Sequence, residues 1–329
     1  MRTSDVHQHA DSIHDWSQEY DQLSRGRFAG SLREIWSDAP RTQVFHEYTE
    51  QLTFQQCMPW RGSIWIGIPD HGAYRDLGFC GHDMTDAAPM LMNATDNEMF
   101  SLSTPKKFGI YGVLIEQSEW MLRRERLGLN PMHRSALHAT AMSVETHREL
   151  TALIEAILRT GDEGTPPEHA MLDGMLDQLL DMLCIVCDGD SAFQKDRRFR
   201  DRLNVVIRAR ALVLDDCDSV DEAVRLERLC DHLHVTRRTL QNYCTSVVGK
   251  SPAHFLKAVR LSACRRALLA AEPLSVQDVA WRWGFRHLGH FSQDYKLMFE
   301  ELPSSTRKDG LVSRIAMLSG EVASLLCQR

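Results

Sequence analysis

The sequence predicts an α+β protein in which a strand-rich N-terminal domain is followed by an all-helical C-terminal domain. Two observations lead to this expectation. Between residues 41 and 115, short runs of β-branched and aromatic residues alternate with Gly, Pro, Asp and Asn, as in a sandwich or barrel. Beyond residue 203, apolar residues recur at the spacing of helices instead. The 329 residues are enough for two domains of ordinary size.

The composition is typical of a globular protein that stays in the cytoplasm. It is 43% hydrophobic and 25% charged. No run of about 18 apolar residues predicts a membrane span, and the polar N-terminus lacks the apolar stretch of a secretory signal. The nine cysteines are scattered, and we expect free thiols in a reducing compartment. Cys184 and Cys187 lie in an apolar helical pattern, which favours buried, inert thiols over a redox or metal site.

Charge is distributed unevenly along the chain. The net charge of −7 combines −11 for residues 1–202, +3 for residues 203–310 and +1 for residues 311–329. A mildly basic C-terminal domain is compatible with binding to the phosphates of a nucleic acid, although the contrast alone does not establish such binding.

The strand-rich part of the chain is expected to end in helices. Strands are predicted at residues 42–48, 52–58, 63–68 and 108–115, and helices at residues 119–127 and 143–159, before a break at 160–167. An apolar stripe with the spacing of an amphipathic helix follows. It consists of Leu172, Met175, Leu176, Leu179, Leu180 and Leu183. The stripe would either pack on its own barrel or serve as a dimerisation face, since regulators that bind two half-sites are usually dimers.

Residues 224–248 have the pattern of a helix, a tight turn and a second helix. Thr236 is a good N-cap for the second helix, and Gly249 is a typical C-terminal signal. In such a helix-turn-helix, the start of the second helix contacts base edges, while Leu240 and Tyr243 would face the core. Arg can pair with guanine edges, and Gln or Asn with adenine. The expected DNA contacts here are Arg237, Arg238, Thr239, Gln241 and Asn242.

The same arrangement recurs near the C-terminus. Ser275 caps a short helix, Gly284 forms the turn, and a second recognition helix is expected at residues 288–299. Phe291, Tyr295 and Phe299, four residues apart, form its core stripe. Its Gln suits a base edge and its Lys a phosphate. The expected DNA contacts of this motif are Arg286, His287, Gly289, His290, Gln293 and Lys296.

A helix from Pro252 to about Ala271 joins the two motifs. Pro252 suits a first helical turn, with Ser251 as the N-cap. About 20 residues at 1.5 Å each span roughly 30 Å, and one turn of B-DNA is about 34 Å long. We therefore expect one chain to place two recognition helices in successive major grooves on one face of the DNA.

With these motifs in place, residues 203–306 resemble the DNA-binding domain of AraC/XylS-type transcription regulators. The matching stretches are residues 226–249 (LERLCDHLHVTRRTLQNYCTSVVG), 251–268 (SPAHFLKAVRLSACRRAL) and 275–307 (SVQDVAWRWGFRHLGHFSQDYKLMFEELPSSTR). The last stretch is most similar to the subgroup around ethanolamine-utilisation and amine-dehydrogenase operon regulators. It departs from the family where Gly289 and His290 replace longer polar residues, so we expect this helix to position the protein more than to recognise bases.

The resemblance implies a cupin-like β-barrel at the N-terminus that senses a small-molecule effector and controls a catabolic operon. It also implies a homodimer that contacts RNA polymerase at a promoter, more usually as an activator. The expected segments are an effector-sensing and dimerisation domain at 1–190, a linker at 191–202, the DNA-binding domain at 203–310 and a tail at 311–329.

The candidate effector-binding residues are aromatic side chains that could wall a pocket and carboxylates that could pair with a cationic ligand such as an amine. They are Glu47, Trp60, Trp65, Asp70, Tyr74 and Glu116. Each of these side chains is also compatible with a plain core or surface position.

Two alternatives stay open from the sequence. A cupin-type metal enzyme would need His and Glu ligands on neighbouring strands. His7 and His9 have a suitable spacing but lie in a stretch expected to be disordered, and His46 and Glu47 would point to opposite faces of a strand. A cyclic-nucleotide-responsive regulator would hold a phosphate between two arginines on one helical face, Arg198 and Arg202. We expect no enzymatic activity, no metal and no cofactor.

Overall fold

A computed structural model describes residues 1–71, 75–84, 88–95, 99–130, 137–162, 169–189, 197–215, 222–270 and 273–312. The chain divides into two compact units. The first contains residues 1–20 and 28–201, and the second contains residues 21–27 and 202–329. The first unit mixes strands and helices and the second is helical, so the α+β class is confirmed.

The described strands form two antiparallel sheets rather than one closed barrel. The seven-stranded sheet contains, in spatial order, β1 (Arg2–Thr3), β3 (Gly30–Asp38), β4 (Arg41–Thr49), β11 (Phe108–Glu116), β6 (Ser63–Pro69), β9 (Met90–Thr95) and β12 (Leu137–Ala141). The five-stranded sheet contains β2 (Ser17–Gln22), β5 (Thr53–Met58), β10 (Phe100–Thr104), β7 (Gly78–Phe79) and β8 (His82–Asp83). The four strands predicted from the sequence are β4, β5, β6 and β11.

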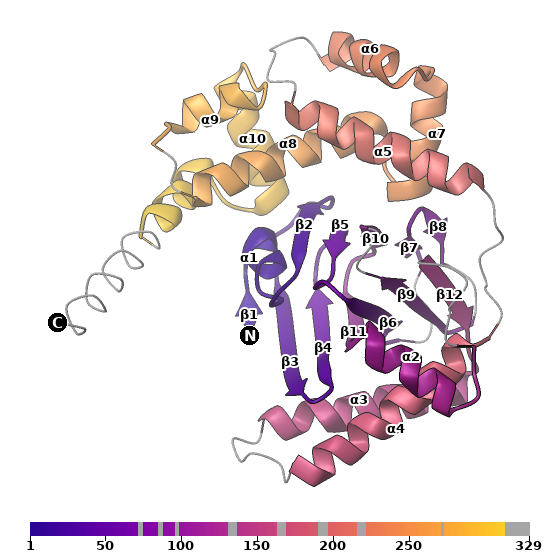
Figure 1. The fold of residues 1–329 in the computed structure, drawn as a ribbon. Coiled ribbons are helices and arrows are strands. Elements are labelled where there is room, and N and C mark those ends of the chain that lie inside the picture. The colour runs from indigo at the N-terminus through magenta and orange to yellow at the C-terminus, as the bar shows by residue number, and fades with distance from the viewer. Residues whose placement is uncertain are drawn as a thin grey trace. The chain divides into compact units, whose positions relative to one another are not determined.

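Alternation along the central strands divides the side chains between two layers. Val44, Val113 and Ile66 lie side by side on β4, β11 and β6 and belong to the core that faces the helices. On the opposite face, Trp65 stacks on Phe100 of the five-stranded sheet, with ring centroids 4.3 Å apart. The seven-stranded sheet is therefore covered by helices on one face and by the second sheet on the other (Figure 1).

Three helices complete the first unit: α2 (Gln117–Arg126), α3 (Val144–Asp162) and α4 (His169–Cys187). The predicted break at 160–167 begins later than expected, because α3 continues to Asp162, and residues 163–168 lie outside the described part. The leucines of the apolar stripe are buried against the sheet. The stripe is thus core of its own unit, and the interpretation of these leucines as a free dimerisation face is wrong.

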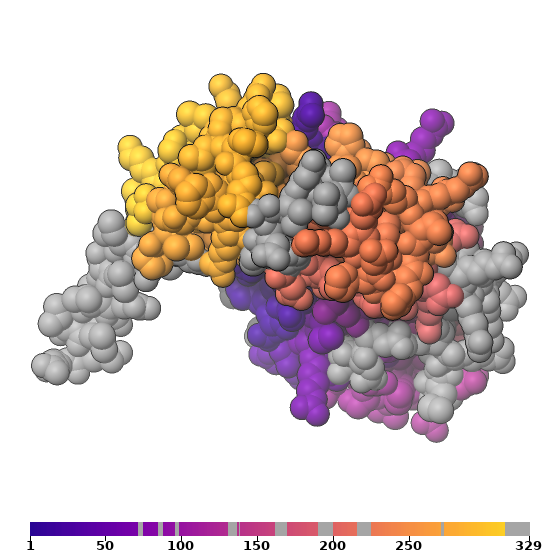
Figure 2. All heavy atoms as spheres, turned by 90° about the horizontal axis from the view of Figure 1, so that it is seen from above, coloured from indigo at the N-terminus to yellow at the C-terminus, as the bar shows by residue number. Residues whose placement is uncertain are grey.

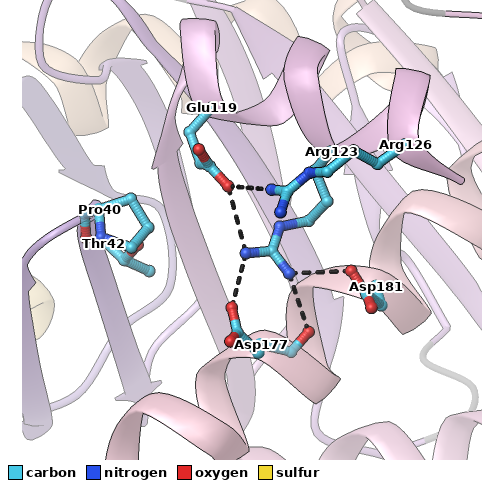
Figure 3. A network of polar contacts seen from close by, with 7 residues as sticks. All are labelled: Pro40, Thr42, Glu119, Arg123, Arg126, Asp177 and Asp181. Atoms are coloured by element: carbon cyan, nitrogen blue, oxygen red, sulfur yellow. Dashed lines mark hydrogen bonds and ion pairs between the residues drawn. The ribbon is translucent and has the colours of Figure 1, made fainter.

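Arg123 fixes α2 to α4. Its guanidinium contacts Glu119 on its own helix at 3.2 Å, and Asp177 and Asp181 on α4 at 2.7 and 2.8 Å (Figure 3). Burial acts to lower the pKa of the Arg123 guanidinium, but the hydrogen bonds and charges of Asp177 and Asp181 outweigh it and raise that pKa, which keeps the group charged.

The N-terminal stretch is ordered, contrary to the sequence-based expectation. Asp5 caps a short helix, α1 (Val6–Ala10), by accepting hydrogen bonds from the backbone amides of His7 and Gln8. His9 is fully buried and its Nε2 lies 3.0 Å from a carboxylate oxygen of Glu47 on β4. The contact with Glu47 on a distant strand thus helps to hold this polar N-terminal segment in the core.

Cys184 and Cys187 are buried at the end of α4, as expected, and are free thiols. Burial raises the pKa of Cys184 to about 12 and also raises the pKa of Cys187, so both stay protonated near neutral pH.

The second unit is built from helices. They are α5 (Arg197–Asp215), α6 (Glu222–Leu233), α7 (Arg237–Val248), α8 (Pro252–Leu269), α9 (Val276–Arg282) and α10 (Leu288–Phe299). The second half of the predicted linker at 191–202 overlaps α5, which begins at Arg197. Residues 313–329 of the predicted tail lie outside the described part. Among the described helices, none combines the length and the apolar character that a membrane crossing requires.

Candidate nucleic-acid interface

The first helix-turn-helix motif consists of α6 and α7, joined by a turn at His234, whose φ is +53°. The hydroxyl of Thr236 accepts a hydrogen bond from the backbone amide of Thr239 at 3.1 Å and so caps the start of α7. Gly249 ends α7 with a φ of +63°, a conformation that suits glycine. Local sequence therefore determines both ends of this helix, as predicted.

The inner face of α7 differs from the prediction at one position. Leu240 is fully buried as expected, but Tyr243 is only half-buried and Cys244 takes the next core position. A residue four positions from Leu240 lies on the same helical face, whereas one three positions away lies at its edge. Burial raises the pKa of Cys244 to about 12.

The outer face of α7 carries the side chains proposed to contact DNA. Arg238, Gln241 and Asn242 are exposed, and Thr239 is half-buried beside the cap. Arg237 is exposed too, but it is engaged in an ion pair with Glu227 of α6 at 3.0 Å. Among the residues that the structure describes, Arg238 forms no hydrogen bond or ion pair. Its guanidinium is thus available to a ligand without breaking an internal contact.

The second motif consists of α9 and α10. Ser275 and Asp278 form a capping box, in which each side chain bonds to the backbone amide of the other residue. The Ser275 hydroxyl also donates a hydrogen bond to Asp278 Oδ2 at 2.6 Å, and this bond, together with the one from the Ser275 amide, lowers the pKa of Asp278. On α10, the aromatic stripe of Phe291, Tyr295 and Phe299 is buried, as expected from its spacing. Gly289, His290, Gln293 and Lys296 are exposed beside it.

A hollow of about 460 Å³ lies between α9 and the start of α10. Four of the predicted DNA contacts, Arg286, His287, Gly289 and His290, line it. A side chain at position 289 would meet open space, so glycine there widens the hollow. The lining also includes residues that the sequence reasoning missed, Gln277 and Trp281. Trp281 is 45% exposed, an unusual position for so large an apolar side chain.

The helix α8 joins the two motifs. It begins at Pro252 with Ser251 as its cap, as predicted, and ends at Leu269, two residues earlier than predicted. Its 18 residues span roughly 27 Å. In Figure 2, the orange atoms of α6 and α7 and the yellow atoms of α10 both reach the surface on the viewed side of this unit.

The candidate effector residues that the structure describes lie at separate places in the first unit. Glu47 is buried beside His9, and Trp65 is buried in the aromatic layer between the sheets. Trp60 lies under the guanidinium of Arg41, whose carbon is 4.4 Å from the ring centre. Asp70 instead pairs with His46 on the helix-facing side of the sheet, at 3.2 Å. Of the two others, Glu116 is exposed where α2 begins and Tyr74 lies outside the described residues.

The two alternatives gain no support from this geometry. His46 and Glu47 do face opposite sides of β4, as expected. Within the described ranges, no group of three or more His, Cys, Asp or Glu side chains could hold a metal ion. The pair proposed for a cyclic nucleotide lies at the start of α5, where the side chain of Arg198 is outside the described part.

Comparison with known proteins finds similarity in part of the chain. Residues 229–309 match the family model of a helix-turn-helix domain. The regulatory protein HrpB of Ralstonia nicotianae is 34% identical over 101 residues, which make up 30% of this chain and 21% of that protein. A probable thc operon regulatory protein of Rhodococcus erythropolis is 34% identical over 85 residues, 25% of this chain and 26% of that protein.

A XylDLEGF operon transcriptional activator of Pseudomonas putida is 31% identical over 91 residues, 27% of this chain and 28% of that protein. The matches to these three relatives therefore cover between 21% and 28% of the relatives' own length. Residues 229–309 thus form a helix-turn-helix domain like those of transcription regulators.

Proposed function

We propose that this chain is a transcription regulator of the AraC/XylS type that binds double-stranded DNA through residues 203–310. The observation that carries the proposal is a pair of helix-turn-helix motifs joined by one helix, α8. In each motif, the second helix has a polar and exposed outer face. One such motif also occurs as a structural helical hairpin. Two motifs at a separation close to one turn of DNA are best explained by two successive major grooves.

The first motif is the one that recognises bases, and the second mainly positions the protein. Arg238, Gln241 and Asn242 offer α7 the side chains that pair with guanine and adenine edges. Around the hollow of the second motif, Gly289 offers no side chain, and Arg286, His287 and His290 suit phosphate oxygens better than base edges. Gln293 and Lys296 extend this surface along α10.

The two roles predict different responses to substitution. Loss of a base contact relaxes specificity at one position of the operator, whereas loss of a phosphate contact weakens binding to all sequences and reduces its salt dependence.

The N-terminal unit is proposed to be a cupin-like sensor of a small molecule. A cationic ligand such as an amine is proposed because the carboxyl group of Glu47 is buried beside His9, at 3.0 Å, and a cationic ligand would form a charged contact with it. An amine would compete with His9 for Glu47.

A thermal-shift screen tests the effector proposal. We expect small amines to raise the melting temperature of the wild-type chain, and the Glu47→Gln variant to lose this response. Glu149→Gln is the matched control, because Glu149 is exposed on α3, one of the helices on the face of the seven-stranded sheet opposite to Trp65. If Glu47→Gln responds to amines like the wild type, the carboxylate does not bind the effector.

The remaining parts of the proposal concern assembly. A homodimer that contacts RNA polymerase and activates a catabolic operon would let an effector shift the balance between two arrangements of the DNA-binding units. Because the leucines of α4 are buried in the core of their own unit, dimerisation would need other surfaces. Sedimentation of the purified chain with and without operator DNA tests the dimer.

Selection of DNA tests the proposed function as a whole. The purified full-length chain is incubated with a library of random duplexes, and bound DNA is amplified and sequenced over several rounds. We expect enrichment of one motif with two conserved segments about 10 base pairs apart. Binding without enrichment of any sequence would contradict the proposal.

A further inference from the structure

The turn of the second motif, Gly284–Phe285, is the place where the two motifs meet. Its backbone is fixed by hydrogen bonds from the amides of Gly284 and Phe285 to the carbonyls of Trp281 and Ala280, at 2.9 and 2.8 Å. Gly284 has a φ of +77°, which side chains rarely adopt. The turn sets where α10 begins, and it is therefore the element through which the second recognition helix is placed.

Arg225 reaches this turn from the first motif. It lies on α6 and is buried. Its guanidinium occupies the space beside Gly284: a methyl group at that position would lie 2.9 Å from Nη1 and 3.0 Å from Cζ of Arg225. Glycine at 284 is thus required by its neighbour as well as by its backbone angle. The Arg225 side chain of the first motif thus packs directly against the turn of the second.

Arg260 holds the other side of the turn from α8. It is buried, and its Cζ lies 4.8 Å from the ring centre of Phe285. The Phe285 ring in turn packs on Phe291 of α10, with centroids 5.1 Å apart. The same turn is therefore held by a cation from the first motif and by a cation from the connecting helix.

Buried arginines are a costly way to fill a core, because removing a guanidinium from water is unfavourable and an apolar side chain of similar volume often stabilises a fold better. The rigid, planar guanidinium of an arginine instead fixes the direction of the contacts that the side chain makes. Two buried arginines converge on the element that sets the start of α10. This favours a role in geometry over a role in bulk stability.

We infer that Arg225 is a positioning residue that fixes the second recognition helix relative to the first and so determines which spacing of the two DNA half-motifs the chain accepts. The inference rests on the proposed function, since it assumes that both motifs enter the same DNA. It adds that the two motifs bind as one rigid body rather than as two independently tethered domains, because Arg225 packs against Gly284 and Arg260 packs on Phe285 in the same turn.

A spacing series tests this inference. The operator obtained by selection with the wild-type chain is made in versions with one base pair inserted or removed between its two half-motifs. Each such change turns the second half-motif by about 34° and moves it by about 3.4 Å. Affinities of the full-length chain are normalised to the fraction of protein that binds the original operator, so that partial misfolding does not distort the ratios.

We expect the wild type to lose at least tenfold in affinity on either change of spacing. Arg225→Met, which keeps the apolar stem and removes the planar cation, is expected to lose less than threefold. Arg228→Met is the matched control: Arg228 lies on the same helix but is exposed, so its loss should lower affinity for all spacings alike and preserve the tenfold discrimination.

A second variant perturbs the same contact without removing the charge. Gly284→Ala places a methyl group where the Arg225 guanidinium lies, and we expect the same relaxed spacing. If both variants keep the wild-type discrimination, the inference is overturned while the proposed function stands. If the wild type enriches no sequence in the selection, the proposed function itself has failed, and the two failures are thereby distinguished.

Discussion

Replacing Arg238 with alanine removes one exposed guanidinium from the first recognition helix and changes little else. Arg238 lies in the first turn of α7, where it forms no hydrogen bond or ion pair with another described residue, and the helix cap is supplied by Thr236. The variant should therefore fold like the wild type. Any loss of DNA affinity then reports a contact with DNA.

The expected magnitude follows from the kind of contact. An arginine that pairs with a guanine edge contributes about 1–3 kcal/mol of discrimination, which corresponds to roughly a fivefold to 150-fold loss of affinity. Arg237 provides the comparison. Its ion pair with Glu227 joins side chains that are 52% and 65% exposed, and such surface pairs contribute little to stability because water and salt screen them. For Arg237→Ala we expect a loss of only a few-fold, similar for all sequences.

Competition binding measures both variants on the selected operator and on operators with single base changes. The Arg238→Ala variant should lose affinity for the operator and become indifferent to the base at one position of the first half-motif. The reasoning would be refuted if Arg238→Ala bound within twofold of the wild type and kept its base preference at every position, while Arg237→Ala lost tenfold or more.

Three further predictions concern stability. Tyr295→Phe removes a buried hydroxyl that donates to Thr306 Oγ1 at 2.9 Å, and should lower the free energy of unfolding in urea by about 1 kcal/mol. A charged hydrogen bond from Arg33 lowers the pKa of the Glu155 carboxyl group from its usual 4.5. The stability that this bond gives the folded state should be fully present above pH 4.5 and be lost as the pH falls through the lowered pKa. A Glu155→Gln variant should thus differ from the wild type in urea unfolding at pH 6 but converge with it in acid. Arg123→Met leaves three carboxylates near one another and should lower the melting temperature measured by circular dichroism, with a smaller deficit at low pH.

The two recognition helices could be located from the sequence because local signals determine them. Thr236, Gly249 and Ser275 sit at helix ends and their side chains or backbone angles act within four residues. The aromatic stripe of α10 has a regular four-residue spacing. Such signals need no knowledge of the rest of the fold, which explains why the bounds of α7 and α10 agree with the prediction.

The N-terminal unit could be predicted only in part, because its cohesion depends on distant contacts. The burial of His9 requires Glu47 on another strand, and nothing in the surrounding Asp, Gln and His residues indicates it. For the same reason, the candidate effector residues could be named by type but not grouped. Asp70 and Glu47 are separated by the sheet itself, as only the strand register reveals.

Part of the candidate interface was also missed, for a different physical reason. The sequence places Val279 and Ala280 of the short helix α9 inward, and both are buried. Trp281 was missed because a large apolar side chain is expected in the core, whereas it is 45% exposed. The buried arginines at the Gly284 turn were equally invisible, because charged residues are expected at the surface.

The central claim is that one chain binds two successive major grooves through α7 and α10. Hydroxyl-radical footprinting of the wild-type chain on its selected operator tests this claim most directly. The account predicts two protected segments on the same face of the duplex, about 10 base pairs from centre to centre. A single protected segment, or two segments on opposite faces, would contradict it.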